Sequence, residues 1–218
     1  MVTVSHLVKK ALSENSFLLE AISKDLISHG NLAEQLKPEI EKELGKKVKD
    51  AAIVMALRRY AEELHSFDKK IRKFKFQGEI IMRTNILDFN VIKSGTLLNK
   101  IKNIYNLVSF EKGDTLNIIL GSNEVSIVTN EKYKEKLSNF LKGEKILNKE
   151  FDLVALTIVF EGEKFLTTSG VIFTAIRKLA WEQINIYEIV STKTELSFIL
   201  GKKDSMKAYN ALQGLVGK

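Results

Sequence analysis

Two periods of hydrophobic residues alternate along the last third of the chain. Residues 153–160 are mostly Val, Ile, Leu and Thr, which predicts a strand. From Val171 to Trp181 the apolar residues recur at helical spacing, which predicts a helix with a preceding Ser or Thr as its N-cap. The remaining elements are predicted as two strands and a last helix, at 184–186, 195–199 and 204–216. This order is most of a ferredoxin-like βαββαβ unit, ending at a helix where a fourth strand is expected.

The middle third repeats this order. Four of its segments match segments of the last third in sequence, namely Ser94-Gly95, 116–118, 124–128 and 133–141. The spacing between matched segments drifts by a few residues, as it does when loops change length within a duplicated domain. We therefore expect an α+β protein in which two ferredoxin-like βαββαβ units, 77–150 and 151–218, follow an N-terminal helical domain.

Three short motifs of the last third resemble the ACT domain family, which is best known from the regulatory end of aspartate kinases. The first is Ser169-Gly170-Val171, where the family usually has Pro-Gly-Val. The others are Ile-Asn-Ile at 184–186, in the predicted second strand, and Glu-Leu-Ser-Phe at 195–198, in the third. Two such units in tandem are also similar to the arrangement in aspartate kinases. The resemblance implies a small-molecule sensor.

The resemblance also implies where a ligand would bind. In the ACT family a small ligand, commonly an amino acid, sits between the loop after the first strand and the start of the helix, often at a dimer interface. Free backbone N–H groups and the helix dipole favour a carboxylate there. Carried over position by position, the implied ligand-binding residues are Thr167, Thr168, Ser169, Gly170, Val171, Ile172, Asn185 and Ile186. Their counterparts in the first unit form a second, lower-ranked site: Ser94, Gly95 and Asn117.

A simpler interpretation of these motifs remains open. Ser169-Gly170 would then be an ordinary helix cap and Asn185 a turn residue, with no ligand at either position.

Residues 1–67 are predicted to be all-helical. Asn31 is a suitable N-cap, Pro38 either begins or kinks a helix, and Gly45 is a suitable C-terminal glycine. The strongest helical pattern follows at 50–64. Beyond it, 68–76 alternates basic and apolar residues, which predicts a linker or a wing strand.

This N-terminal pattern resembles the helix-turn-helix or winged-helix domain of transcriptional regulators. In such domains the second helix enters the major groove of DNA while basic residues contact phosphates. The predicted DNA contacts are Lys46, Lys47, Lys49, Arg58 and Arg59. The alternative is a small helical bundle that docks on a partner or dimerises, with the same charges as its solvated face.

Composition excludes several classes of function. The net charge of +7 is carried mainly by the first third, which permits contact with nucleic acid but also suits a heat-adapted protein. The sequence has no Cys and three His, and it contains no phosphate-binding glycine loop and no nucleophile motif. We expect no catalysis, no cofactor and no metal. With no apolar run long enough to span a membrane, we expect no membrane partner and a cytoplasmic location.

The sequence therefore predicts a homodimeric regulatory protein that senses an amino acid and transmits the signal to an N-terminal domain that binds double-stranded DNA. The alternative is a regulatory subunit that does not bind DNA and controls a partner enzyme, with the helical domain as its docking module. A tandem scaffold without a ligand is the third possibility.

Overall fold

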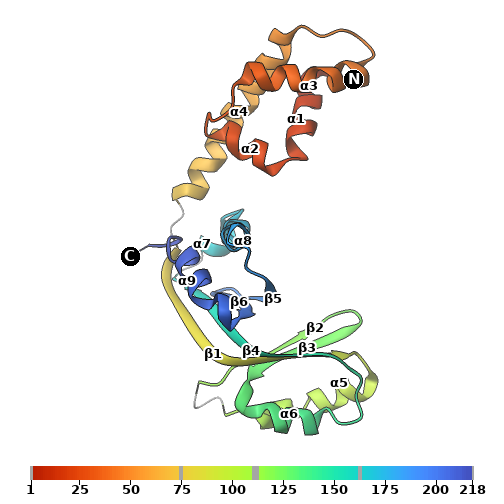
Figure 1. Cartoon of the computed structure of the whole chain (residues 1–218), viewed down its shortest axis with the longest axis vertical. Coiled ribbons are helices and arrows are strands. Elements are labelled where there is room, and N and C mark those ends of the chain that lie inside the picture. The colour runs from red at the N-terminus through yellow and green to blue at the C-terminus, as the bar shows by residue number, and fades with distance from the viewer. Residues whose placement is uncertain (1, 74–75, 110–112, 162–163, 218) are drawn as a thin grey trace. The chain divides into compact units, whose positions relative to one another are not determined.

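The chain divides into two units that each have their own internal packing. The computed structural model describes residues 2–73, 76–109, 113–161 and 164–217. Met1–Phe74 forms one unit, here called the helical unit, and Lys75–Lys218 forms the other, here called the sheet unit. The protein is thus α+β, with N-terminal helices followed by a curled antiparallel sheet (Figure 1).

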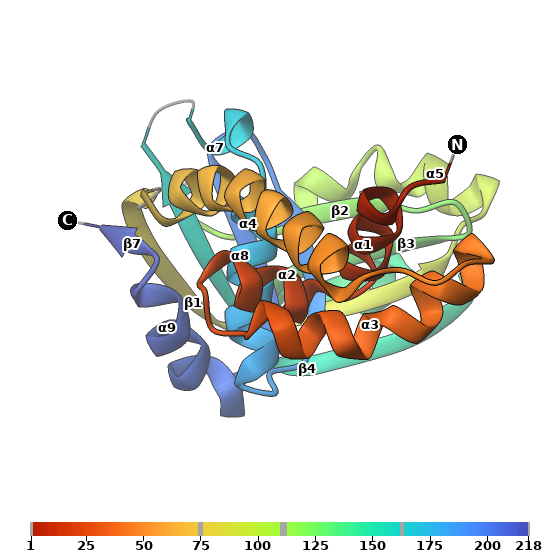
Figure 2. The same cartoon turned by 90° about the horizontal axis from the view of Figure 1, so that it is seen from above.

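The helical unit contains α1 (Val4–Ser13), α2 (Ser16–Ser23), α3 (His29–Leu44) and α4 (Asp50–Lys73). Figure 2 shows these four helices from above. They surround one apolar core that includes Leu12, Ile22 and Leu57, all fully buried. Burying this apolar surface stabilises the bundle, because each such side chain contributes about 1.5–3 kcal/mol relative to an exposed one.

The helix ends of this unit differ from the predicted ones. Ser28, not Asn31, caps α3: its hydroxyl accepts the N–H of Asn31, which already lies inside the helix. Pro38 also lies inside α3. Gly45 ends α3 in the left-handed conformation, as predicted. The stretch interpreted as a linker or wing strand is helical as far as Lys73, the last residue of α4.

The sheet unit alternates strands with helices that cover one face of the sheet. Its strands are β1 (Phe76–Ile92), β2 (Leu116–Leu120), β3 (Glu124–Asn130), β4 (Ile146–Phe160), β5 (Ile186–Ser191), β6 (Glu195–Gly201) and β7 (Val216–Gly217). Its α-helices are α5 (Gly95–Ile101), α6 (Lys134–Phe140), α7 (Lys164–Thr167), α8 (Val171–Trp181) and α9 (Ser205–Gln213). Short 3-10 turns are η1 (Ile104–Leu107), η3 (Glu131–Tyr133) and η4 (Lys202–Asp204). Within the described residues the strand order is β2-β3-β1-β4-β6-β5, with β7 beside β1.

The two long strands β1 and β4 belong to both halves of the sheet unit. Ile86–Ile92 of β1 pairs with β3 in the first half, whereas Gly78–Arg83 pairs with the part of β4 that lies in the second half. The place of the fourth strand in the second half is therefore taken by the N-terminal part of β1. The chain also adds the two-residue β7, which pairs in parallel with Phe76 and Gln77. This corrects the expectation that the last unit ends without a fourth strand.

A bulge bends each long strand near its middle (Figure 1). Asn85 in β1 has φ 57° and Asp152 in β4 has φ 54°, and the pairing of β1 with β4 shifts register beside both. An extra residue in the left-handed conformation increases the local twist and bends a strand, and Asn and Asp tolerate that conformation better than most residues. The two bulges therefore curl the sheet.

The curl separates an outer face from an inner face. Leu87 and Phe89 of β1 point outward and pack against Leu97 of α5 and Leu137 of α6. The inner face carries a smaller apolar cluster to which β1, β3, β4 and β6 all contribute: Ile86, Val128, Leu153, Ala155 and Ile199. Strands β3 and β6 have the same length and the same pattern of buried and exposed positions. The predicted boundary at residue 150 falls inside β4.

Candidate functional site

The predicted ligand site lies where α7 gives way to α8. Gly170, not a Ser or Thr, is the N-cap of α8, with φ 85° and no side-chain cap. Its carbonyl oxygen accepts the N–H and the hydroxyl of Thr174, at 2.9 and 2.8 Å. Glycine suits this position because the left-handed conformation strains residues that carry a Cβ. The N-cap residue of α8 therefore contributes no side chain to the first N–H groups of the helix.

The structure divides the eight predicted ligand-binding residues into two groups. Six of them, Thr167 to Ile172, form the corner between α7 and α8, where Val171 is buried and Ile172 is 39% exposed. Asn185 is exposed and precedes Ile186, which begins β5 and pairs with Leu200. Helix α8 lies between the two groups in the sequence. Its eleven residues make a helix roughly 16 Å long. Asn185 and Ile186 thus lie near the opposite end of α8 from the corner.

The corresponding helix of the first half begins differently. Ser94 is the N-cap of α5 and accepts the N–H of Leu97 at 2.9 Å. A buried carboxylate, that of Glu144, lies against this cap: its Oε2 accepts the hydroxyls of Ser94 at 2.8 Å and Thr96 at 3.1 Å. Lys100 Nζ lies 2.9 Å from Oε1 of the same group. Hydrogen bonds from Lys100 and Ser94 hold the pKa of Glu144 below its usual value, so a carboxylate of the chain already occupies this corner.

The matching position of the second half carries no carboxylate. Counting onward from the matched strands β3 and β6, the position of Glu144 corresponds to Leu215, an apolar residue that is 9% exposed. The residue that matches Glu144 in the second half therefore supplies no carboxylate to the start of α8. Sequence reasoning did not identify Glu144, because nothing in its neighbourhood marks it apart from its place after the predicted helix at 133–141.

Open space lies beside the first-half corner and beside the bulge of β1. A cavity of about 580 Å³ is lined by Ser94, Gly95, Ser122 and Asn123, among others. Another, of about 460 Å³, lies beside the bulge residue Asn85. Asn117 lines neither of them. The first-half residues Ser94 and Gly95 therefore meet at one cavity, and Asn117 lies elsewhere.

A buried carboxylate on the inner face is electrostatically unusual. Asp88 is 2% exposed and accepts the hydroxyl of Ser126 at 2.7 Å. Burial raises the pKa of Asp88 to about 6; the hydrogen bonds from Ser126 and Asn90 oppose this rise, while the charges of Glu188 and Glu150 add to it.

The five predicted DNA-binding residues are all exposed. Lys46, Lys47 and Lys49 lie in the connection between α3 and α4, and Arg58 and Arg59 lie on α4. The buried residues of the same helix include Ile53 and Leu57, so the two arginines lie off its core face.

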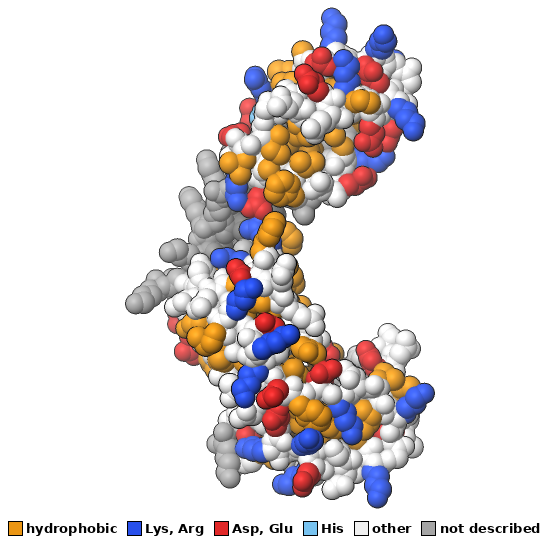
Figure 3. All heavy atoms as spheres, in the orientation of Figure 1, with side chains coloured by type: hydrophobic (Ala, Val, Ile, Leu, Met, Phe, Trp, Pro, Cys, Tyr) orange, Lys and Arg blue, Asp and Glu red, His pale blue; other side chains and the backbone are white. Residues whose placement is uncertain are grey.

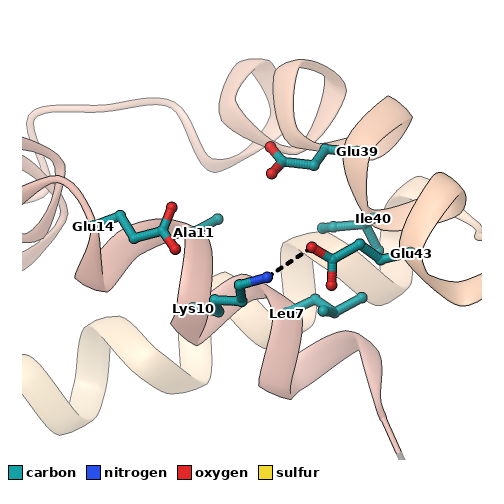
Figure 4. Close-up of a pocket in the computed structure, with 7 residues that line it drawn as sticks. All are labelled: Leu7, Lys10, Ala11, Glu14, Glu39, Ile40 and Glu43. Carbon is teal, nitrogen blue, oxygen red and sulfur yellow. Dashed lines mark hydrogen bonds and ion pairs between the residues drawn. The ribbon is translucent and has the colours of Figure 1, made fainter.

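A shallow groove between α1 and α3 is too small for a ligand. Figure 4 shows Lys10 of α1 extended toward Glu43 of α3, with Glu14 and Glu39 nearby. Lys10 Nζ lies 2.8 Å from Glu43 Oε1, and this hydrogen bond is the largest cause that raises the pKa of Lys10. The cavity measures about 10 Å³, room for about one water molecule. We attribute this groove to packing between helices.

The described residues include no group of three or more potential metal ligands and no helix that could cross a membrane.

The fold matches structures of aspartate kinase regulatory regions. The regulatory subunit of aspartate kinase from Thermus thermophilus aligns with a TM-score of 0.53 at 14% identity, over 66% of this chain and 99% of that one. The one from Thermus flavus gives 0.52 at 15% identity, over 65% and 98%. A structure of aspartokinase alpha and beta subunits gives 0.52 at 19% identity, over 64% and 97%. No protein-family model and no curated protein sequence matches.

These similarities establish an ACT-like fold of the kind that the motifs at 169–171, 184–186 and 195–198 predict. The aligned share is about two thirds of the chain, which is the share that the sheet unit occupies. The similar structures lend no support to a helix-turn-helix domain or to DNA binding in this chain.

Proposed function

We propose that this chain is a regulatory subunit whose sheet unit binds an amino acid and whose helical unit docks on a partner enzyme. The ACT-like fold supports the sensing role, since the similar structures are regulatory parts of an aspartate kinase. Regulation then requires only that the amino acid favour one of two states of the chain by about 1–3 kcal/mol. In this proposal the chain itself performs no catalysis.

The observation that carries the proposal is the contrast between the two helix starts. At α5 the Glu144 carboxylate accepts two hydroxyl groups beside the N-cap, whereas α8 begins at Gly170 without a side-chain cap. The N–H groups of a helix start attract a carboxylate. We propose that the carboxylate of an amino acid binds at the α8 corner, near Ser169, Gly170 and Val171, as the chain's own carboxylate does at α5.

Exposed apolar residues support a docking role for the helical unit (Figure 3). Among its residues whose burial is described, the large apolar side chains that this unit exposes are Val2 at 54%, Phe17 at 64%, Leu26 at 73% and Met55 at 56%. We propose a homodimer as well, because β2 and β5 end the sheet order and the edge strand β5 exposes Tyr187 and Ile189.

DNA binding remains the second candidate, supported by the exposure of all five predicted basic contacts.

A thermal-unfolding screen of the full chain against the L-α-amino acids at millimolar concentration tests the sensing role. An amino acid at 100 times its Kd adds about 2.7 kcal/mol to stability, which shifts the midpoint visibly. Gly170→Leu should reduce that shift by the part that binding at the α8 corner contributes, because a bulky side chain fills the corner.

Gly143→Leu is the matched control, since Gly143 also has a positive φ, of 88°, with open space around it. Circular dichroism checks that both variants fold. A screen with no amino acid that stabilises the protein would refute the sensing role, and an equal loss in both variants would remove the α8 corner from it.

A further inference from the structure

A cavity on the inner face lies between the two halves of the sheet unit. It measures about 220 Å³, which corresponds to roughly seven water molecules at ~30 Å³ each. The first half contributes the segment from Asp114 to Asn117, which enters β2, and the second half contributes β4, β5 and β6. A small amino acid has a comparable number of non-hydrogen atoms, so the space suits one.

Two opposite charges line this cavity without a partner. Among the residues that the structure describes, none forms an ion pair or a hydrogen bond with the guanidinium of Arg83 or with the carboxylate of Glu195. The third charged group there, Asp114, is already compensated: Lys132 Nζ lies 2.6 Å from its Oδ1 and the Tyr133 hydroxyl donates to its Oδ2. Within the described part of the chain, the cavity therefore offers one free cation and one free anion.

The strand register explains why these two charges do not pair with each other. Arg83 lies beside Ala155 on β4, and Glu195 lies beside Val159 on the same strand. Four residues of strand separate those positions by roughly 13 Å. Because β1 and β6 flank β4 on opposite sides, two strand spacings of ~4.8 Å add to this offset and bring the separation to roughly 16 Å. Two side chains cannot span that distance in a direct ion pair, but a small molecule between them can contact both.

We propose that this cavity binds a zwitterionic α-amino acid, with its carboxylate on Arg83 and its ammonium group toward Glu195. Arg presents a planar fork of N–H donors that matches a carboxylate. The hydroxyls of Thr157 and Ser197, 2.8 Å apart and buried, line the cavity and offer further hydrogen bonds. The choice of an amino acid as the ligand rests on the proposed function. The inner-face cavity is a different place from the α8 corner.

The corresponding place in the first half does not offer the same chemistry. The pair of facing residues that matches Thr157 and Ser197 is Asn90 and Ser126. Both hydrogen-bond the buried carboxyl group of Asp88, and the charges of Glu150 and of Glu188 on β5 act on Asp88 as well. Three carboxylates repel the carboxylate of an amino acid. Among the described residues, the inner face therefore provides one such site in each chain.

Isothermal titration of the full chain with the L-α-amino acids, and with the N-acetyl and amide derivatives of any that binds, tests this inference. Arg83→Gln and Glu195→Gln should each weaken binding roughly tenfold or more, because each removes a charge-assisted hydrogen bond. Blocking the ligand's own ammonium group in the N-acetyl derivative, or its carboxylate in the amide derivative, should weaken binding to a similar extent. Arg58→Gln and Glu124→Gln are the matched controls, the second being the first-half counterpart of Glu195, and neither should change affinity.

The Gly170→Leu variant separates this site from the α8 corner. Binding that remains in Gly170→Leu and is lost when Arg83→Gln is added to that variant supports the inner site, whether or not the α8 corner also binds. Binding that survives in both charge variants and is lost in Gly170→Leu overturns this inference and leaves the proposed function standing. No binding by any amino acid overturns both. The unliganded midpoints of the variants, followed by circular dichroism, show that a loss of binding is not a loss of fold.

Discussion

Replacing Asp88 by Asn should stabilise the protein, and only above about pH 4. Asp88 is 2% exposed, and burial raises its pKa to about 6 from its ordinary value of 3.8. The folded state therefore binds this proton more readily than the unfolded state, and the free energy of unfolding falls as the pH rises from about 4 to about 6. Two pKa units at 1.36 kcal/mol each make the ionised carboxylate unfavourable by about 2–3 kcal/mol at neutral pH.

The asparagine side chain of this variant keeps the shape of the carboxyl group and an acceptor for Ser126, which donates at 2.7 Å, but it carries no charge. At pH 8 the Asp88→Asn variant should therefore gain about 2–3 kcal/mol over the wild type, and at pH 4 the two should be equal. For a unit of this size that gain corresponds to a midpoint shift of roughly 5–10 °C.

Urea unfolding at a series of pH values measures this difference. Trp181, the one Trp of the sequence, lies in α8 and reports on the sheet unit alone. Ser126→Ala is the opposite control: it removes a donor to the ionised carboxylate and should lower stability at pH 8 more than at pH 4. A gain in Asp88→Asn that is the same at every pH, or a loss at pH 8, would refute the argument from charge.

Three further predictions concern the strands and the basic helix. Gly78→Ala should destabilise the sheet unit by roughly 1–3 kcal/mol or more, because its Cβ would lie 1.8 Å from a carbonyl oxygen of β4, whereas Gly95→Ala, with open space around it, should not; denaturant midpoints compare the two. Asn85→Val should lose about 1–2 kcal/mol at φ 57° while Asn85→Gly loses little, and equal losses measured by thermal unfolding would contradict the bulge argument. If the helical unit docks on protein, Arg58→Ala combined with Arg59→Ala should leave fluorescence anisotropy of a labelled DNA duplex unchanged; weaker binding with a flatter salt dependence would favour the DNA-binding alternative instead.

Local patterns predicted the identity of most elements, because each helix or strand buries one face and its sequence shows the period of that face. The run at 195–199 is such a case: β6 covers Glu195–Gly201 and its middle is buried. Cap chemistry was less predictable. Ser28 and Asn31 are both good N-caps, and only the packing of α3 decides between them.

What the sequence did not reveal depends on contacts between distant segments. The alternation at 68–76 suits a strand, yet α4 continues to Lys73, an example of context overriding local pattern. The shared strands β1 and β4, the Glu144 carboxylate beside α5 and the free charges of Arg83 and Glu195 all require the sheet to be folded before they meet. No local spacing encodes them.

Strand sharing makes the two halves of the sheet unit mechanically inseparable. A single backbone, β4, continues from an edge beside β1 in the first half to the central strand of the second, and β1 does the reverse. Any displacement of one half along these strands must be carried covalently into the other, without a relay of side chains. It also means that neither half can be excised as a working module, since a cut between them would leave each with an unpaired central strand.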